Sequence, residues 1–236
     1  MVKKGTLYLI PNFLGDRKEA HLLPAIVSET ILHIQYFAVE EIRSARHLIS
    51  RINKSVPIDS LHFFTLNEHS DPAQLSEILE PLLEGFDLGI ISEAGCAAIA
   101  DPGTDLVRMA HEKNIRVVPL TGPSSILLSL ISSGLNGQSF SFEGYLPKER
   151  ELRIKKLREL DVATHKTGQT KIFIETPYRN NHLLEDILSQ CNVQTRLCIG
   201  CNINGAGEMI VTKTISAWKK QVPDLGKMPT VFLLGK

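Results

Sequence analysis

The chain has 236 residues, 43% of them hydrophobic and 22% charged, which is the composition of a globular protein of one or two domains. Its 26 Lys and Arg residues balance its 26 Asp and Glu residues, so no overall field attracts a polyanion, and a nucleic acid would have to bind a local patch. No apolar run approaches the ~20 residues of a membrane span, and the opening apolar run is too short for a secretion signal. We therefore expect a cytoplasmic protein without a membrane segment.

The first half of the chain alternates predicted strands with predicted helices. Apolar runs rich in β-branched and aromatic residues predict strands at 7–10, 31–39, 61–66, 87–91 and 115–120. Apolar residues at helical spacing predict helices at 40–53, 71–85, 104–114 and 121–134. The second helix has clear end signals, with Asp71 as N-cap, Pro72 in the first turn and Gly85 just past the end. Such alternation predicts a mostly parallel sheet covered by helices on both faces.

The pattern changes after Gly137. Strict alternation of apolar and polar residues predicts a half-buried strand at 138–146, and helices are expected at 148–160 and 180–190. Further strands are predicted at 171–175, 195–203, 207–215 and 230–235. The strands on either side of Asn204 and Gly205 are expected to form an antiparallel pair. The sequence therefore predicts two α/β domains, residues 1–136 with a mostly parallel sheet and residues 137–236 with a mixed sheet.

The four cysteines favour reduced thiols over a disulfide framework in a chain of this length. Cys198 and Cys201 have the spacing of zinc ligands, but no second pair follows. They also lie on a predicted strand, which would turn them to opposite faces of the sheet. We therefore predict no metal site. Trp218 has Ile215 at helical spacing and is expected in the core.

Three loops of unusual composition follow strands of the first domain, at 11–16, 92–103 and 121–125. Ligands of open α/β sheets bind at the carboxyl ends of the strands, and glycines let the backbone approach them closely. The second loop carries Glu93 and Asp101 and almost no cations, which suits a neutral or cationic ligand better than a phosphate. The alternative is that these loops are plain connections, with Asp101-Pro102-Gly103 forming a turn.

The middle of the chain resembles the tetrapyrrole (corrin/porphyrin) methylase superfamily. The motifs Ser92 to Gly103, Pro119 to Ser124 and Phe142 to Pro147 look most like the branch that 2′-O-methylates a cytidine in small-subunit ribosomal RNA. The likeness continues in "LYLIPNFLGD", "AVEEIRSARHLI", "NEHS" and "IFIETPYR", so it covers nearly the whole chain. Glu93 and Cys96-Ala97 depart from the pattern conservatively, whereas "GCNINGAGE" replaces a basic motif of the branch with a neutral turn.

This resemblance implies a methyltransferase that binds S-adenosylmethionine in a cleft between two α/β domains, forms a homodimer, and acts on ribosomal RNA or the small ribosomal subunit. By motif position, the residues implied to line the cofactor are Pro11, Ser92, Glu93, Ala94, Gly95, Cys96, Ser124, Ser125, Glu175, Thr176, Pro229 and Thr230. Two alternatives remain open: a methyltransferase with a small-molecule, tetrapyrrole-like acceptor, and a pseudoenzyme that keeps the fold and binds cofactor or a partner.

The acceptor side has several candidate residues. A 2′-hydroxyl gains from a general base, for which Glu68 in "NEHS" is the first candidate and Glu93 and Asp101 follow, while Glu68 could equally serve as a cap or ion-pair partner. Substrate-binding cations are predicted at three arginines. These are Arg43, Arg46 and Arg179. The charged helix at 148–160 is a further basic candidate, with a merely solvated face as the alternative.

Overall fold

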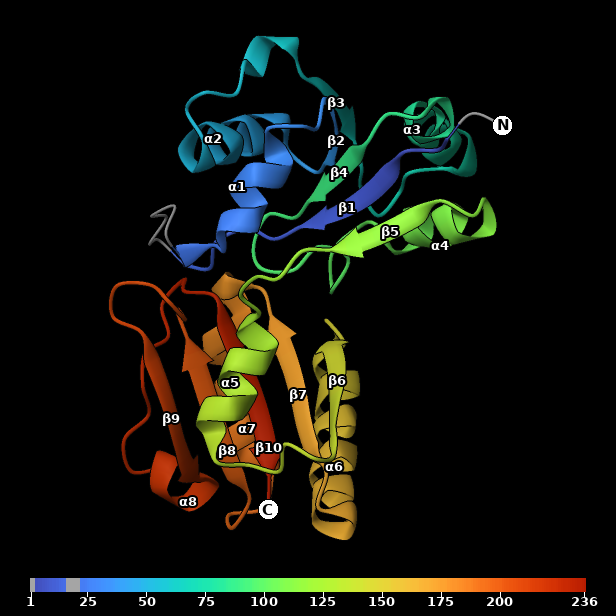
Figure 1. Ribbon diagram of the computed structural model, residues 1–236. Coiled ribbons are helices and arrows are strands. Elements are labelled where there is room, and N and C mark those ends of the chain that lie inside the picture. Colours follow the sequence, from blue (N-terminus) through green and yellow to red (C-terminus); the bar gives the residue numbers. More distant parts are fainter. Residues whose placement is uncertain (1–2, 16–21) are drawn as a thin grey trace. The chain divides into compact units, whose positions relative to one another are not determined.

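The computed structural model describes residues 3–15 and 22–236, and the chain divides into two compact units, Met1–Pro123 and Ser124–Lys236. Each unit is built around its own five-stranded sheet (Figure 1). None of the helices among the described residues combines the length and the apolar character that crossing a bilayer requires.

The first unit contains an all-parallel sheet with the strand order β3-β2-β4-β1-β5. Its strands are β1 (Thr6–Ile10), β2 (Tyr36–Val39), β3 (His62–Thr65), β4 (Leu88–Ile91) and β5 (Arg116–Pro119). Its helices are α1 (Ala25–Ile31), α2 (Ile42–Ile52), the 3₁₀ turn η2 (Ile58–Ser60), α3 (Pro72–Glu84) and α4 (Thr104–Glu112). In-register pairing brings the carboxyl ends of neighbouring strands to one edge, as Val39 lies opposite both Thr65 and Ile91.

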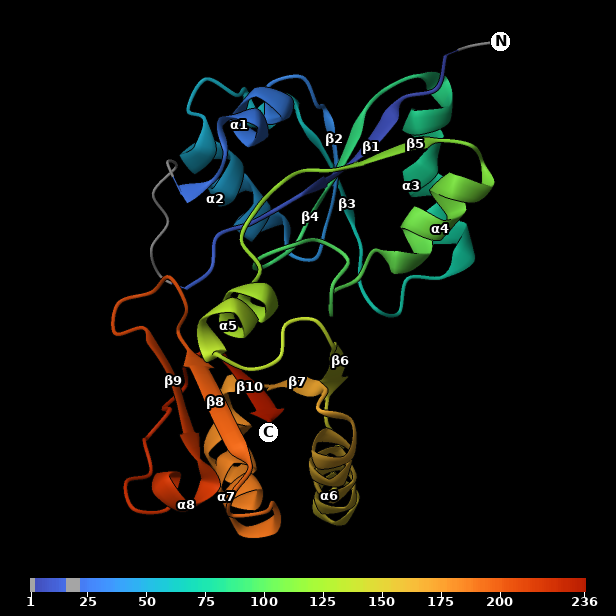
Figure 2. The same ribbon diagram turned by 60° about the horizontal axis from the view of Figure 1, so that its bottom comes forward.

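Helices cover both faces of this sheet, as Figure 2 shows. One apolar cluster joins α1 and α2 to one face of the strands and contains the fully buried Phe37. A second cluster joins α3 and α4 to the other face, around the fully buried Leu88. Strands buried on both faces read as continuous apolar runs, which is why the sequence predicts a parallel sheet here.

The end signals of α3 act as predicted. The Asp71 carboxylate accepts a hydrogen bond from Gln74 N at 2.9 Å, which satisfies one of the free amides of the first turn. Pro72 occupies the first turn, and Gly85 ends the helix with a φ of 101°, a conformation that favours glycine. These signals are local, so the chain alone is enough to predict them.

The second unit contains a mixed sheet with the order β6-β7-β10-β8-β9, in which β6 and β7 are parallel and the remaining pairs antiparallel. Its strands are β6 (Phe140–Tyr145), β7 (Thr170–Glu175), β8 (Arg196–Cys201), β9 (Met209–Thr214) and β10 (Thr230–Gly235). Its helices are α5 (Ser125–Ser133), α6 (Arg150–Thr167), the 3₁₀ turn η3 (Pro177–Arg179), α7 (Asn180–Gln190) and α8 (Ile215–Trp218). The predicted antiparallel pair is β8 and β9.

Two apolar clusters also stabilise the second sheet. Figure 1 shows α5 in front of the sheet and α6 and α7 behind it. Cys198 lies in the cluster on the α5 face and Cys201 in the cluster on the other face, so the prediction that they point to opposite faces is confirmed. Trp218 is buried as predicted, and its indole N–H donates to Leu197 O at 2.9 Å.

Two sequence predictions require correction. The strand predicted over 31–39 is confined to β2, because Ile31 belongs to the end of α1, where it and Val27 are buried at helical spacing. The helix over 121–134, α5, packs with Leu130 against the second sheet. The structure therefore divides the chain before this helix, between Pro123 and Ser124, and not after it at 136–137 as predicted from the sequence.

Candidate active site

Three loops that follow β1, β4 and β5 meet at the carboxyl edge of the first sheet. Asn12 joins two of them, because its N–H donates to Gly95 O at 2.8 Å and its side-chain amide donates to Ser92 O at 2.8 Å and Glu93 O at 2.9 Å. The Ser92 hydroxyl donates to Gly95 O at 3.0 Å and tightens the β4 loop on itself. The loops predicted from sequence are therefore adjacent, at least for residues 11–15, since Asp16 lies outside the described residues.

The β5 loop packs closely against the β1 and β4 loops. A Cβ added to Gly122 would lie 2.1 Å from the Cβ of Pro11, a separation that real atoms do not adopt, so only glycine permits this contact. Cys96 lies with its thiol 3.5 Å from Pro123 O, and burial raises the pKa of this thiol. Cys96 is thus a protonated packing group and weak donor rather than a thiolate nucleophile.

The second half of the β4 loop holds an unusual backbone. Ala98 and Ala100 have positive φ angles of 63° and 58°, and Gly103 has a φ of 127°. Left-handed conformations cost a non-glycine residue about 1 kcal/mol or more, so the surrounding packing must impose them. Between them lies Asp101, which is partly buried.

Acidic side chains from three neighbouring strands gather at this edge. Glu40 follows β2, Glu68 follows β3, and Glu93 and Asp101 follow β4. Burial, together with Glu40 and Glu93, raises the pKa of Asp101 to about 7. Burial, with Glu93 and Glu68, likewise raises the pKa of Glu40. The edge therefore concentrates negative charge that a cationic ligand would neutralise.

The four acids differ in exposure. The Glu68 side chain is 83% exposed and lies 3.5 Å from the ring of His69, itself 84% exposed. Glu93 is also exposed, whereas Glu40 and Asp101 are half-buried. Glu40 was missed by the sequence analysis, although its position immediately after the buried run "FAV" marks it as a carboxyl-edge residue. Asn12, which joins the loops, was missed as well.

In the second unit, the predicted cofactor residues adjoin one another across three strands. Thr230, the first residue of β10, pairs with Glu175 at the end of β7 and with Cys201 at the end of β8. The buried Glu175 carboxylate accepts from the N–H of Thr176 at 2.7 Å and pairs with Arg179 at 2.5 Å. Pro229 O accepts from Asn202 N at 2.8 Å. Ser124 is the N-cap of α5, which begins at Ser125.

The three predicted substrate-binding arginines have different surroundings. Arg46 forms an ion pair with Asp59 at 2.5 Å, and Arg179 is engaged by Glu175. Arg43 is exposed and its side chain has no ion-pair partner in the described part of the chain. Of the three, Arg43 is thus the one whose charge is free for a ligand.

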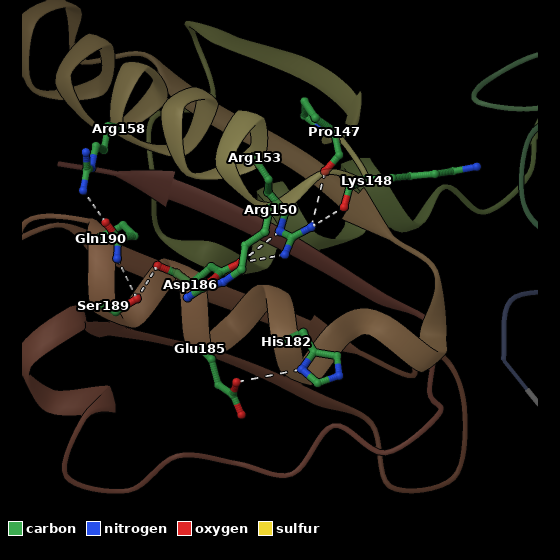
Figure 3. A network of polar contacts seen from close by, with 10 residues as sticks. All are labelled: Pro147, Lys148, Arg150, Arg153, Arg158, His182, Glu185, Asp186, Ser189 and Gln190. Atoms are coloured by element: carbon green, nitrogen blue, oxygen red, sulfur yellow. Dashed lines mark hydrogen bonds and ion pairs between the residues drawn. The ribbon is translucent and has the colours of Figure 1, made fainter.

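The basic helix predicted at 148–160 uses much of its charge internally, as Figure 3 shows. Arg150 and Arg153 of α6 both pair with the buried Asp186 of α7. Arg158 donates to Gln190 at 2.6 Å, and Lys156 pairs with Glu143 at 3.0 Å. This surface is therefore mainly a helix-to-helix contact rather than a basic patch. Within residues 3–15 and 22–236, no three His, Cys, Asp or Glu side chains converge as a metal site would require.

Comparison with known proteins finds curated relatives that share one name and solved structures with the same fold. No family model matches the chain. The chain is 32% identical over 182 residues to ribosomal RNA small subunit methyltransferase I of Vibrio cholerae and 33% identical over 185 residues to that of Halalkalibacterium halodurans. It is 28% identical over 233 residues, or 98% of its length, to the protein of the same name from Haemophilus influenzae. This chain is a divergent relative of the ribosomal RNA small subunit methyltransferase I proteins. The resemblance to this branch of the tetrapyrrole methylase superfamily, predicted from the motifs, is confirmed.

The match is partial in length. The chain spans 59% and 60% of the first two relatives and 78% of the third. Among solved structures, the methyltransferase CobJ has the same fold, with a TM-score of 0.63 over 98% of this chain and 94% of that one, at 15% identity. A uroporphyrin-III C-methyltransferase from Thermus thermophilus matches with a TM-score of 0.55 and 13% identity over 98% of this chain and 92% of that one. The predicted fold of two α/β units, one parallel and one mixed, is confirmed.

Proposed function

We propose that this protein is an S-adenosylmethionine-dependent methyltransferase that modifies small-subunit ribosomal RNA at the 2′-hydroxyl of a cytidine. One observation carries the proposal. The carboxyl edge of the first sheet joins three small-residue loops, at Pro11, Ser92 to Cys96 and Gly122, to the acids Glu40, Glu93 and Asp101, whose carboxylates have no ion-pair partner among the described residues. The relatives that the chain matches are named ribosomal RNA small subunit methyltransferase I.

The edge suits the cofactor for a physical reason. The cofactor supplies a methyl group on a positively charged sulfonium, and a cation relieves the repulsion among Glu40, Glu93 and Asp101. Glu93 and Ala94 are exposed, and a glycine at position 95 has no side chain that would keep a ligand from the main chain. Pro11, Ser92 and Cys96 complete this side, and Ser124 and Ser125 follow at the start of α5.

The second unit is proposed to contribute further contacts. The resemblance assigns these to Glu175, Thr176, Pro229 and Thr230, which are adjacent at the β7, β10 and β8 ends. Because the Glu175 carboxylate is already paired with Arg179, its role is to hold the Thr176 backbone in place rather than to carry free charge.

Proton transfer from a 2′-hydroxyl requires an acceptor near neutral pKa. Asp101, with its pKa raised to about 7, meets this requirement. Glu68, the first candidate from sequence, is largely solvent-exposed. We therefore propose Asp101 as the proton acceptor and place Glu68 second. Methyl transfer is an in-line displacement, so the main contribution of the other residues is positioning of the two reactants.

Two measurements test this function. The first is binding of S-adenosylmethionine by calorimetry, and the second is transfer of tritiated methyl groups to small ribosomal subunits that lack the modification. Absence of cofactor binding refutes the proposal. Binding of cofactor with methylation of a tetrapyrrole such as uroporphyrinogen-III, but not of subunits, favours the small-molecule alternative. Binding without any transfer favours a pseudoenzyme.

We further propose, by the same resemblance, a homodimer in the cytoplasm. Sedimentation equilibrium tests the oligomeric state, and fractionation of cells tests the location. A monomer at all concentrations would remove the dimer from the proposal without affecting the chemistry.

A further inference from the structure

Every charged side chain on the exposed face of α2 is basic. Arg43, His47 and Arg51 follow one another at four-residue intervals, so they lie along one side of the helix, and Lys54 continues the line just beyond its end. The whole helix, "IRSARHLISRI", contains no Asp or Glu. We name these four residues the α2 basic face. In a chain with a net charge of +0, such a one-signed stretch is a local exception.

Packing explains the orientation of this face. Ala45, Leu48, Ile49 and Ile52 are buried against the first sheet, which turns the intervening polar positions to solvent. A solvated helix face in an ordinary protein mixes charges of both signs, because pairs spaced by three or four residues stabilise the helix. The α2 basic face lacks such pairs. Arg43, His47 and Arg51 are each other's neighbours at four-residue spacing, and none of them is acidic.

The nearby acids do not neutralise this face. Glu41 is the N-cap and accepts from the backbone N–H of Arg43 at 3.0 Å, and Asp59 pairs with Arg46 on another side of the helix. The side chains of the α2 basic face form no ion pair or hydrogen bond within the described ranges. By contrast, cations of α6 such as Arg153 and Lys156 are paired within the second unit. The cations of the α2 basic face are thus available to a ligand, whereas several cations of α6 are already in ion pairs within the second unit.

The position of α2 relates this face to the candidate active site within the same unit. Glu40 belongs to the acidic edge, and Arg43 lies in the first turn of the helix that starts two residues later. The positively charged residues therefore begin close in sequence to the acidic edge and continue along α2. At a rise of 1.5 Å per residue, Arg43 and Arg51 are about 12 Å apart along the axis, enough to follow several nucleotides of an RNA strand.

We infer that the α2 basic face binds the phosphodiester backbone of the RNA substrate next to the nucleotide that enters the acidic edge. This inference rests on the proposed function and specifies how its substrate is held. The two surfaces have opposite charges and bind different groups. The acidic edge binds the cationic cofactor and repels phosphates, and the α2 basic face attracts the phosphates and so holds them away from the acids. Phosphate contacts of this kind position the strand without reading its sequence.

The test uses the protein as it stands and an unmodified transcript of small-subunit ribosomal RNA. Affinity is measured between about 50 and 200 mM KCl for the parent and for the double variant Arg43→Gln/Arg51→Gln. Removing one cation that neutralises a phosphate of a single strand lowers the slope of log affinity against log salt by about 0.7, or roughly five-fold in affinity at 0.1 M salt. We expect the slope of the double variant to fall by about 1.4 and its affinity to fall roughly 25-fold.

A matched control removes the same charge elsewhere. Lys155 and Lys166 are exposed on α6, and Lys155→Gln/Lys166→Gln also lowers the net charge by two. This control should bind the transcript as the parent does. An unchanged slope in the α2 variant, or an equal loss in the control, overturns the inference. All of these residues are exposed, so thermal unfolding should be the same for the three proteins.

The outcomes separate this inference from the proposed function. Cofactor binding is measured in parallel on all three proteins and should be unchanged. A parent that methylates subunits while the α2 variant keeps its affinity refutes only the α2 basic face. If the parent binds RNA through α2 but does not bind S-adenosylmethionine, the proposed methyltransferase function is refuted and the inference about the α2 basic face is supported. A parent that does not bind the transcript at all refutes the α2 basic face, whatever its cofactor binding.

Discussion

Arg153 on α6 donates two hydrogen bonds to the same carboxylate oxygen of Asp186 on α7, from Nε at 3.0 Å and from Nη2 at 2.8 Å (Figure 3). Its remaining nitrogen, Nη1, donates to Lys148 O at 2.9 Å. Both side chains are buried, at 9% and 3% exposure. The pair thus ties together α6, α7 and the backbone that follows β6.

Removing the carboxylate should therefore destabilise the second unit strongly. Asp186→Ala leaves the Arg153 guanidinium buried without its partner, and breaking a buried pair in this way costs about 3–5 kcal/mol. The measurement is the free energy of unfolding in urea. Glu185→Gln is the control, because the neighbouring Glu185 is 74% exposed and lies 3.9 Å from His182, so it should cost well under ~1 kcal/mol. Equal effects of the two changes would contradict the assigned role of Asp186.

Gly122→Ala should impair the cofactor loops. The new methyl group would overlap Pro11 at 2.1 Å, so the β1 and β5 loops must separate. We expect the affinity for S-adenosylmethionine to fall by at least about tenfold, since displacement of binding groups by ~1 Å is costly. Calorimetric titration of the folded variant measures this. Gly137→Ala has open space around the added Cβ and should bind like the parent. Wild-type affinity in Gly122→Ala would remove this contact from the site.

The sequence predicts most of the fold because its signals are local. The caps of α3 and the apolar runs of β1, β3, β4 and β5 depend on neighbouring residues alone, and both appear as predicted. The strand predicted over 31–39 is wrong in its first half, because a short amphipathic helix end and a buried strand both read as apolar runs. The placement of α5 also escapes prediction, since an apolar helix does not specify which sheet it covers.

The site follows a similar division. The loops at Pro11, Ser92 and Gly122 are predictable, because strand ends and glycines mark them in the sequence. Their connection through Asn12 is not, because it depends on β1 lying next to β4, a result of strand order. Likewise, the sequence presents Arg43, Arg46 and Arg179 as equivalent cations. Only the tertiary structure shows that two of them are paired with Asp59 and Glu175.

Asp101 should make stability fall as pH rises. Its pKa is about 7 in the folded protein, against an ordinary value of 3.8, so between about pH 4 and pH 7 the folded protein keeps a proton that the unfolded chain has released. The contribution of this group is therefore greatest in acid and is lost by neutral pH. Asp101→Asn cannot ionise, so its Tm should exceed that of the parent by a few degrees at pH 8 and equal it at pH 4. Scanning calorimetry at both pH values measures the difference.

Exposed Asp105 provides the control for this effect. Asp105 pairs with Arg108 at 2.8 Å, with a side chain 66% exposed. Asp105→Asn should show no stabilisation at pH 8. If Asp101→Asn behaves like Asp105→Asn, then Asp101 is already ionised in the folded protein at neutral pH. Burial and repulsion by Glu40 and Glu93 would then have little effect on the pKa of Asp101.

Catalysis should distinguish Asp101 from Glu68. If Asp101 accepts the proton, Asp101→Asn lowers kcat for methyl transfer by about 10²–10⁴-fold and abolishes its rise between pH 6 and 8, because the neutral amide cannot take a proton. Glu68→Gln should leave the pH profile in place, since the exposed Glu68 lies beside His69 and is solvated. Single-turnover rates with labelled cofactor and unmodified small subunits measure both effects. A pH dependence that disappears in Glu68→Gln, with Asp101→Asn active, would assign the proton to Glu68, the residue that the sequence analysis named first.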